Sequence, residues 1–301
     1  MKILTLFFLL ILITSCSQPM EIIDRNTKIP TDITKMTPEM DLHPPILHSD
    51  EFEQPVPLAI VNTAGGEDSP FIYNDELYFF FTPDVRIPAE KQVIDGVTGI
   101  YLSKNVNGAW QEPERVALQK RGKLSLDGCQ FVNDNLMYFC TAREGYTGLY
   151  WFSAERENGQ WTNWKLNDFN PEYNVGELHI YEDELYFHAD HDGNLDIWVS
   201  KKANNQWQSP QNLEIVNSPE NEGWPYVSSD GQELWFLRTY LGTPALFRSF
   251  RTEQGWTEPE LIMSQFAGEP TLDNQGNLYF VHHYYKDSVM LEADIYVAYK
   301  K

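Results

Sequence analysis

The chain has 301 residues, of which 42% are hydrophobic and 14% aromatic, so it can bury a large core and is not intrinsically disordered. Its 44 acidic and 22 basic residues give a formal charge of −22, which argues against a nucleic-acid partner, because such binding needs clustered Lys and Arg. The 9 Trp, 18 Gly and 18 Pro predict aromatic strands separated by frequent turns rather than long helices.

Residues 1–15 have the pattern of a signal peptide. Lys2 provides a short positive region, and the apolar run from Ile3 to Ile13 is too short to span a bilayer. The run leads into Thr14-Ser15-Cys16, which resembles the lipobox of bacterial lipoproteins. This resemblance implies that Cys16 is acylated and anchors an exported protein of the cell envelope, on its periplasmic or extracellular face. An ordinary signal peptide or an uncleaved anchor is the alternative.

Residues 16–50 are polar and carry scattered Pro, Thr and acidic residues with little periodicity. This composition predicts a flexible tether between the membrane and the folded domain, which we expect to span residues 51–301.

The predicted domain contains an internal repeat of four strands per unit. The second strand of each unit is aromatic, at residues 77–80, 136–139, 185–187, 234–236 and 278–280. The fourth strand begins at Trp110, Trp161, Trp207 and Trp256, usually as Trp-x-x-Pro. Units of four strands at spacings of about 45 to 60 residues are typical of propeller blades. The sequence therefore predicts an all-β fold, a five-bladed β-propeller with four antiparallel strands per blade.

The fifth unit lacks a fourth strand, because the chain ends at Lys301. Residues 52–62, which begin Phe-Glu-Gln-Pro, repeat the pattern of residues 207–217, which begin Trp-Gln-Ser-Pro. We therefore expect residues 51–65 to supply the outer strand of the last blade and to close the ring.

Three segments of the later units carry a resemblance to a known family. Residues 191–199, His-Asp-Gly-Asn-Leu-Asp-Ile-Trp-Val, resemble the WD40-like repeat of TolB-type periplasmic propellers, as do residues 227–236 and 293–297. The resemblance implies the fold and export, but in that family the repeat is a scaffold and says little about activity.

An acidic residue recurs just before the innermost strand of each predicted blade. These residues are Glu67 and Asp68, Asp127, Glu177, Glu222 and Glu269. In a propeller such positions converge at one mouth of the central channel, where mutual repulsion would raise some of their pKa values.

The second strands end at the same mouth, and they bring basic residues to it. These are Arg143, His188, His191, Arg238, His282 and His283, with Trp224 and Tyr146 nearby. We expect a pocket for a carbohydrate-like ligand or for a cation, with calcium as the first candidate. The alternative is a structural role, in which Arg143 and Arg238 form salt bridges with the acidic residues.

The first three units also resemble the five-bladed glycoside hydrolases of family 43, through Asp68-Ser69-Pro70, Asp127-Gly128 and Gly176-Glu177. The resemblance implies an inverting hydrolase in which Asp68 is the base, Asp127 tunes and orients, and Glu177 is the acid. The chain departs from the family in having Asp-Ser-Pro for Asp-Pro, a competing Glu67 and additional acidic residues in the last two units. Three functions therefore stay open: a ligand-binding protein, a hydrolase, and a non-catalytic scaffold for envelope proteins.

Cys129 and Cys140 remain after the lipidation of Cys16. If Asp134-Asn135 is a two-residue hairpin loop, residue 129 lies opposite residue 140, where a disulfide fits at a non-hydrogen-bonded pair. Two buried thiols are the alternative.

Overall fold

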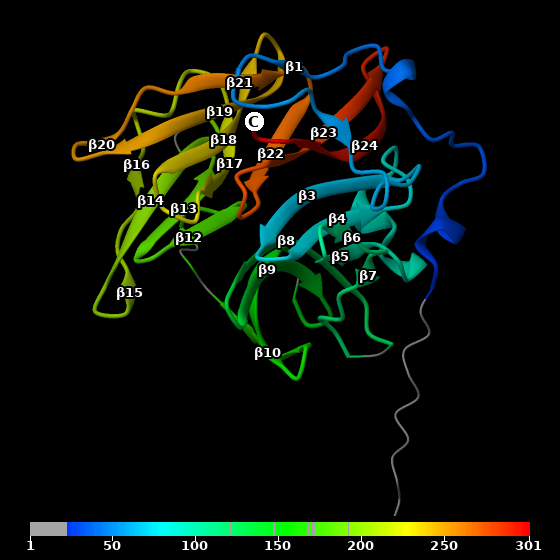
Figure 1. Cartoon of the computed structure of the whole chain (residues 1–301). Helices are drawn as coiled ribbons and strands as arrows, with labels where there is room; N and C mark the ends of the chain where they lie inside the picture. Colours follow the sequence, from blue (N-terminus) through cyan, green and yellow to red (C-terminus); the bar gives the residue numbers. More distant parts are fainter. Residues whose placement is uncertain (1–22, 121, 147, 168, 170–171, 192) are drawn as a thin grey trace, which may run out of the picture.

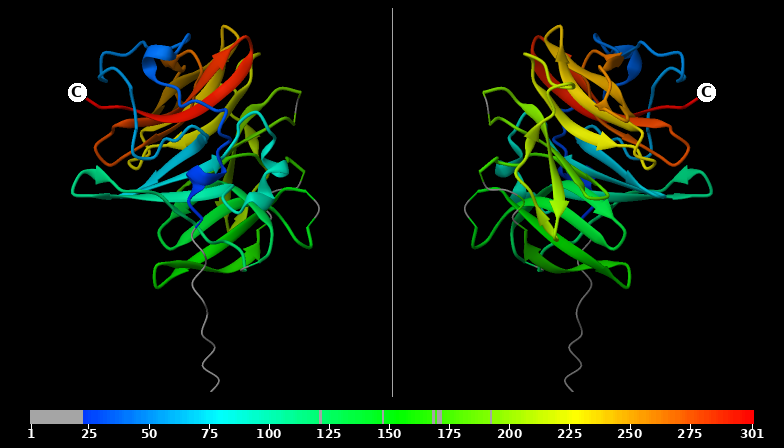
Figure 2. Two further views of the ribbon diagram at one scale, coloured as in Figure 1. Left: turned by 90° about the vertical axis from the view of Figure 1, so that its right-hand side faces the viewer. Right: turned by 90° about the vertical axis from the view of Figure 1, so that its left-hand side faces the viewer.

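The computed structural model describes residues 23–120, 122–146, 148–167, 169, 172–191 and 193–301. The predicted signal peptide and Cys16 lie outside these residues. The fold is all-β, with antiparallel sheets arranged around a common axis (Figures 1 and 2). The described part also holds the short 3-10 helices η1 (Arg25–Lys28), η2 (Pro38–Met40), η3 (Ala89–Lys91) and η4 (Val93–Asp95). No helix of this part is long and apolar enough to cross a bilayer.

Each of the five predicted units forms its own antiparallel ladder. The inner strands are β3 (Gly66–Tyr73), β8 (Ser125–Asn133), β12 (Leu178–Tyr181), β17 (Glu222–Val227) and β22 (Ala267–Leu272). The second strands are β4 (Glu76–Thr82), β9 (Leu136–Arg143), β13 (Glu184–Ala189), β18 (Glu233–Tyr240) and β23 (Leu278–Lys286). The third strands are β5 (Gly99–Val106), β10 (Tyr150–Glu157), β14 (Asp196–Ala203), β19 (Thr243–Thr252) and β24 (Val289–Ala298).

The predicted Trp-x-x-Pro segments form the outer strands. Three of them are split into pairs, β6 (Ala109–Trp110) with β7 (Glu114–Arg115), β15 (Gln206–Trp207) with β16 (Gln211–Asn212), and β20 (Gly255–Trp256) with β21 (Glu260–Ser264). Proline has no backbone N–H, so it interrupts the ladder between the two members of each pair. The second unit has Asn163 and Trp164 in place of Glu-Pro, and its outer strand β11 (Gln160–Leu166) is continuous.

The N-terminal strand pairs with the last unit, as predicted. In β2 (Val56–Pro57), Val56 lies opposite Val297 of β24. A further strand, β1 (Ile46–Leu47), pairs with β21 of the fourth unit. The last and first units also share one sheet, because Ala293 of β24 pairs in parallel with Gly66 of β3. None of the sheets that the described residues form closes on itself, so the structure has a propeller-like arrangement of separate sheets.

The core consists of five apolar clusters, each at a boundary between neighbouring units. One of them joins the last unit to the first: Phe79 and Tyr101 pack with Tyr279 and Ile295. The inner strands also contact their neighbours in order around the axis, including β22 with β3. Burial of aromatic side chains between sheets is therefore the main interaction that holds the units together.

A one-residue β-bulge recurs in the inner strands. In the first, second, fourth and fifth units the pairing register shifts within the inner strand, and Ser69, Cys129, Trp224 and Glu269 have φ between 49° and 57° there. A bulge turns the side chain at its first position to a new direction. These bulges determine which residues face the axis.

The prediction of a flexible tether over residues 16–50 is wrong for the described part of it. Lys35 pairs with Glu292 and Asp294, and the Asp41 carboxylate lies 2.8 Å from Nε2 of His282. The prediction depended on composition, since the segment has few apolar residues. The segment is instead held in place by ion pairs with residues that are distant in the sequence.

Candidate functional site

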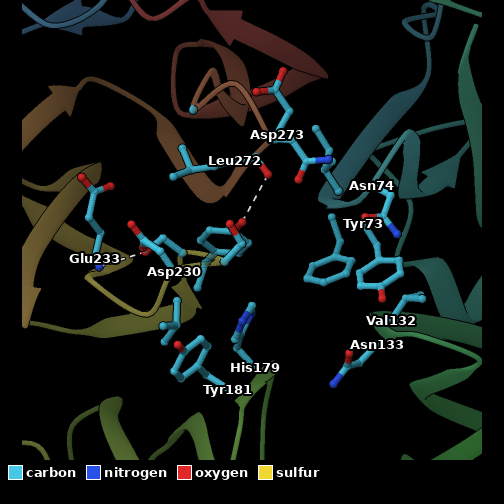
Figure 3. A pocket seen from close by; sticks show the side chains of 18 of the residues that line it. Tyr73, Asn74, Val132, Asn133, His179, Tyr181, Asp230, Glu233, Leu272 and Asp273 are labelled. Atoms are coloured by element: carbon cyan, nitrogen blue, oxygen red, sulfur yellow. Dashed lines mark hydrogen bonds between the residues drawn. The ribbon is translucent and has the colours of Figure 1, made fainter.

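Two cavities lie along the axis. The larger one, of about 520 Å³, is bordered by the turns that join inner and second strands, and we call it the hairpin cavity (Figure 3). The smaller one, of about 50 Å³, is bordered by the bulges of the inner strands, and we call it the mouth cavity. Phe71, His179 and Tyr226 border both cavities, so these rings form the partition between them.

The mouth cavity is bordered by one equivalent residue from every unit: Ser69, Cys129, Glu177, Trp224 and Glu269. Four of them have the left-handed backbone of the bulge, and Glu177 takes the same place in the third unit, where the N–H of Gly176 donates to the carbonyl of His188. Gly176 is required at this point, because a Cβ there would collide with the His188 ring. Two of the predicted acidic residues, Glu177 and Glu269, therefore do converge at one mouth.

Glu269 is the most perturbed group of this site. Its side chain is buried, and one carboxylate oxygen, Oε2, has no hydrogen-bond partner among the described residues. Burial raises the pKa of Glu269 well above its usual value, and the charges of Asp68 and Glu177 raise it further. Glu269 therefore holds its proton to a higher pH than an ordinary carboxyl group does.

The pKa of Glu177 is shifted in the opposite direction. Burial pushes its pKa up, but the hydrogen bond and the charge of His188 outweigh burial, so the pKa of Glu177 lies below its usual value. The His188 Nδ1 accepts the backbone N–H of Trp224 at 3.1 Å, which leaves Nε2 to donate to Glu177, also at 3.1 Å. His188 thus positions both Glu177 and Trp224. A raised pKa for Glu177, as a general acid requires, is not found.

Three buried polar atoms at the mouth cavity have no partner among the described residues: Gln130 Oε1, Trp224 Nε1 and Glu269 Oε2. Gln130 is fixed by its amide nitrogen, which donates to the carbonyl of Ser69. The cavity therefore presents an acceptor, a donor and a carboxyl group that is a donor when protonated. Gln130 was not predicted from the sequence as a site residue. The only sequence signal for it is its position directly after the bulge residue.

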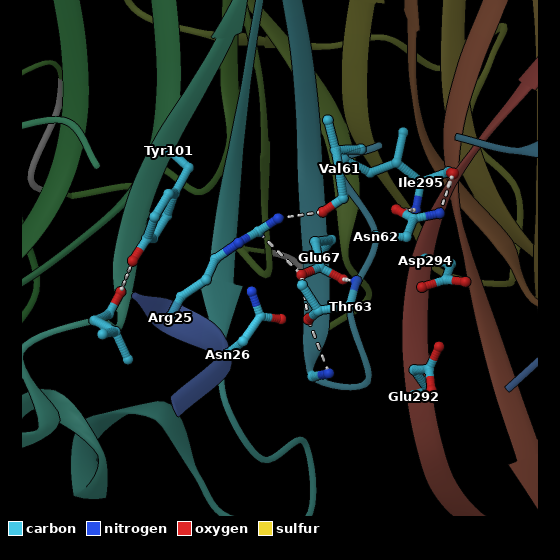
Figure 4. Close-up of polar contacts among 12 residues, drawn as sticks. Arg25, Asn26, Val61, Asn62, Thr63, Glu67, Tyr101, Glu292, Asp294 and Ile295 are labelled. Carbon is cyan, nitrogen blue, oxygen red and sulfur yellow. Dashed lines mark hydrogen bonds and ion pairs between the residues drawn. The ribbon is translucent and has the colours of Figure 1, made fainter. Parts of the chain in front are cut away.

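Three other predicted acidic residues do not border the mouth cavity. Glu67, Asp127 and Glu222 each lie two positions before the bulge residue and are buried against arginines. Arg25 donates to Glu67 at 3.0 Å (Figure 4), Arg143 to Asp127 at 2.7 Å, and Arg238 to Glu222 at 2.6 Å. Of the predicted triad of Asp68, Asp127 and Glu177, only Glu177 borders the mouth cavity, and Asp127 is bonded to Arg143, Ser125 and Thr141.

The three arginines occupy equivalent places although they come from different positions in their units. Each guanidinium lies over a cross-strand aromatic pair: Arg25 is 5.3 Å from the Tyr101 ring, Arg143 is 4.6 Å from Phe152, and Arg238 is 4.6 Å from Phe247. In the fifth unit His282, bonded to Asp41, packs on Tyr296 in the same way. The structural alternative thus describes Arg143 and Arg238 correctly, since both form salt bridges with the predicted acidic residues.

Asp68 and His283 border the site at its solvent side. The Asp68 side chain is 36% exposed, and its Oδ1 lies 3.9 Å from Nε2 of His283. His191 is exposed and stacks on Tyr173 at 4.3 Å between ring centroids, away from the acidic residues. Among the described residues, no group of three or more His, Cys, Asp or Glu side chains is placed to hold a metal ion. The predicted calcium therefore has no support from the geometry.

The disulfide between Cys129 and Cys140 is present, with the two Cα atoms 5.3 Å apart. The register differs by one residue from the predicted one. The bulge places Gly128 rather than Cys129 opposite Cys140, and Cys129 is the next residue along the strand. The disulfide fixes the bulge of the second unit next to the mouth cavity.

Comparison of the sequence with models of protein families and with characterised proteins gives no match. Among solved structures, the chain is similar to a thermostable family-43 glycoside hydrolase, with a TM-score of 0.53 and 15% identity over 79% of this chain and 90% of that one. It is also similar to the Bacteroides ovatus xyloglucan PUL protein GH43B, with a TM-score of 0.49 and 12% identity over 81% of this chain and 53% of that one. For TolB from Acinetobacter baumannii the TM-score is 0.44, with 12% identity over 79% of this chain and 55% of that one.

The chain thus spans about half the length of the Bacteroides ovatus protein and of TolB. At these identities the similarity concerns the fold alone. Both families that the sequence resembles are among the matching structures, and the family 43 hydrolase supports the resemblance in fold.

Proposed function

We propose that this chain is an exported, lipid-anchored β-propeller that binds a polyhydroxyl, carbohydrate-like ligand at the mouth cavity. The observation that carries the proposal is that three residues bordering that cavity, Gln130, Trp224 and Glu269, each have an unpartnered buried polar atom. An unpartnered buried polar group costs about 1–3 kcal/mol, and such groups are usually satisfied by a ligand or by water. A hydroxyl group both donates and accepts hydrogen bonds, so it complements this set.

The size of the cavity suggests how such a ligand is held. A volume of about 50 Å³ admits one hydroxyl or hydroxymethyl group rather than a whole sugar ring. The rest of the ring would lie at the mouth, beside the partly exposed carboxylates of Asp68 and Glu177. This arrangement favours a neutral polyol over a metal ion, since no three of the described carboxylate and histidine side chains are placed to hold one.

The proposal includes a closed ring of five blades. Its support is the apolar cluster between the last and first units together with the pairing of Val56 with Val297. A closed ring brings five inner strands to one axis, which is what a shared mouth cavity requires.

The proposed lipid anchor depends on the sequence around Cys16. Growth of the source cells with a labelled fatty acid tests it: label should be incorporated into the wild type and not into Cys16→Ala. Label in both proteins, or in neither, would contradict the anchor.

Ligand binding is tested with the full-length protein and a panel of monosaccharides and oligosaccharides, by calorimetry and by the shift of the melting temperature. Trp224→Phe keeps an aromatic ring but removes the indole N–H, and we expect affinity to fall about three- to tenfold. Trp207→Phe makes the same change on an outer strand and serves as the matched control.

Two results would contradict the binding proposal. One is an unchanged melting temperature with every glycan of the panel. The other is a glycan whose affinity is the same for the wild type, Trp224→Phe and Glu269→Gln, because that ligand would bind elsewhere.

Glycoside hydrolysis is the second candidate, and one observation favours it. Burial and the charges of Asp68 and Glu177 raise the pKa of Glu269, whereas His188 lowers that of Glu177, so two carboxyl groups at one cavity have pKa values shifted in opposite directions. A hydrolase would release sugars from the panel, and Glu269→Gln and Glu177→Gln would each abolish the release while leaving the melting temperature close to that of the wild type. If no sugar is released but ligands bind, the protein is a binding protein. If neither occurs and a protein partner is recovered from the envelope, it is a scaffold.

A further inference from the structure

The hairpin cavity lies at the opposite end of the axis from the proposed site and has the size of a small-molecule site. Its volume of about 520 Å³ falls within the range of about 300–1,000 Å³ that is usual for ligand pockets. Its polar border comes from the turns of all five units, which contribute Asn74, Asn133, Glu182, Asp230 and Asp273. These turns are positioned by pairs of strands rather than by long loops, so the cavity is preformed.

At the base of this cavity stands an unpartnered histidine. The His179 side chain is 8% exposed, and no hydrogen bond joins its ring to another described residue. Its contacts are ring contacts, at 4.9 Å from Phe131 and 4.9 Å from Tyr226. Figure 3 shows the ring pointing into the cavity. Burial lowers the pKa of His179 to about 3, so the imidazole is neutral and has one free acceptor nitrogen.

Aromatic rings form the base and the walls around His179. Phe71, Phe131 and Tyr226 surround the histidine, and Tyr73 and Tyr181 stand on the two sides of the cavity in Figure 3. The faces of such rings carry partial negative charge and attract cations. The hydroxyl of Tyr73 donates to Asp134 at 2.6 Å, so this ring is fixed in place.

The charges around the cavity have one predominant sign. Asp230, Asp273 and Glu182 border it, against the single cation of Lys300 among the described lining residues. Asp230 accepts hydrogen bonds from Ser228 and from the backbone of Gln232, and the first of these is the main reason why its pKa lies below the usual value. It therefore stays charged across the neutral pH range.

We propose that the hairpin cavity is a second ligand site, which binds a small organic ammonium ion. The ammonium group donates to the free imidazole nitrogen of His179 and lies against the aromatic rings, and the carboxylates at the border compensate its charge. An anionic ligand would meet the acidic border unfavourably. This site is independent of the proposed glycan site, which lies on the other side of Phe71 and Tyr226.

The test compares benzylamine with benzyl alcohol, its uncharged analogue, by calorimetry with the full-length protein. We expect benzylamine to bind with a dissociation constant of about 1 mM or lower, and benzyl alcohol at least about tenfold more weakly. Asp230→Asn keeps both local hydrogen bonds and removes the charge, and should weaken benzylamine about two- to fivefold. Tyr181→Leu removes one wall and should weaken it about two- to thirtyfold.

The experiment must also show that benzylamine binds in the hairpin cavity. The imidazole resonances of His179, assigned with His179→Phe, should move when benzylamine is added, and Trp224→Phe at the mouth cavity should leave the affinity unchanged. Should His179→Phe fail to fold, Asp230→Asn and Tyr181→Leu still decide the question. Equal affinities for benzylamine and benzyl alcohol, no binding up to about 10 mM, or an affinity that only Trp224→Phe reduces would each overturn the proposal. A failure here leaves the glycan proposal unaffected, because the two tests use different cavities.

Discussion

The guanidinium of Arg25 donates a 3.0 Å hydrogen bond to the carboxylate of Glu67, although the two residues lie 42 positions apart. This ion pair is the counterpart of the one between Arg238 and Glu222, which belong to neighbouring strands of one hairpin. The first unit has no arginine of its own at this place, since Phe81 stands where the fourth unit has Arg238. A residue of the N-terminal segment takes over the role, and the segment is thereby part of the domain.

Removal of the segment should therefore destabilise the domain strongly. A chain beginning at residue 51 loses Arg25 and Lys35, which leaves Glu67, Glu292 and Asp294 buried without a cation. Loss of one partner of a buried ion pair costs about 3–5 kcal/mol, so we expect at least that loss in the free energy of unfolding. Urea unfolding of chains that begin at residue 23 and at residue 51 provides the measurement. Equal midpoints would show that the segment is dispensable.

In the buried pair of Arg238 and Glu222, removal of one charged partner should cost more stability than removal of both. The Glu222 side chain is fully buried, and the Arg238 side chain is 16% exposed. Arg238→Met leaves a buried carboxylate alone and should cost about 3–5 kcal/mol, whereas Arg238→Met combined with Glu222→Leu should recover a large part of this loss. Chemical unfolding of the two single variants and the double variant measures the coupling. Additive losses would mean that the two side chains do not stabilise each other.

Glu67 should make the stability depend on pH. Burial raises its pKa from 4.5 to about 7 in the folded protein, which binds this proton more tightly than the unfolded chain does. The stabilisation is therefore complete below the unfolded pKa and is lost as the pH rises through about 7. Over this range the wild type should lose up to about 3 kcal/mol relative to Glu67→Gln, which has no proton to release.

The measurement is the difference in the free energy of unfolding between wild type and Glu67→Gln at several pH values. Subtraction removes the contribution of groups with raised pKa values that do not interact with Glu67, such as Glu269. A difference that is constant with pH would show that Glu67 has an ordinary pKa in the folded protein.

The disulfide should stabilise the second unit. It closes a loop with a sequence separation of 11 residues, and loops of this size contribute about 2–3 kcal/mol through the unfolded state. Replacement of Cys129 and Cys140 by Ala should lower the free energy of unfolding by this amount. The masses of the protein after alkylation with and without reduction report whether the bond is formed. Two alkylated thiols without reduction would refute it.

Much of the fold could be predicted because the repeat is local. The aromatic second strands and the Trp-x-x-Pro segments lie where the pattern places them, and the similarity of Phe52 to Trp207 correctly indicates an N-terminal outer strand. The segment before residue 50 could not be predicted, because Arg25 and Lys35 pair with residues that no local pattern connects to them.

The site was predicted only in part, because a bulge changes which side of a strand a residue faces. Alignment of acidic residues placed Glu67, Asp127 and Glu222 together with Glu177 and Glu269, although the two sets occupy different positions relative to the bulge. A better signal was present in the sequence. Alignment on Asp68-Ser69-Pro70, Gly223-Trp224-Pro225 and Gly268-Glu269-Pro270 puts the bulge residues in one column.

The pairing of β2 with β24 bears on how the chain is made. A ribosome releases the N-terminal part of a chain first, yet Val56 finds its partner Val297 only after the strands of all the intervening units have emerged. The same holds for Ile46 and its partner Ser264. Contacts between such distant segments form late and slowly. The last unit therefore stays incomplete while the chain is being made, and its final assembly waits until β24 is available to pair with β2.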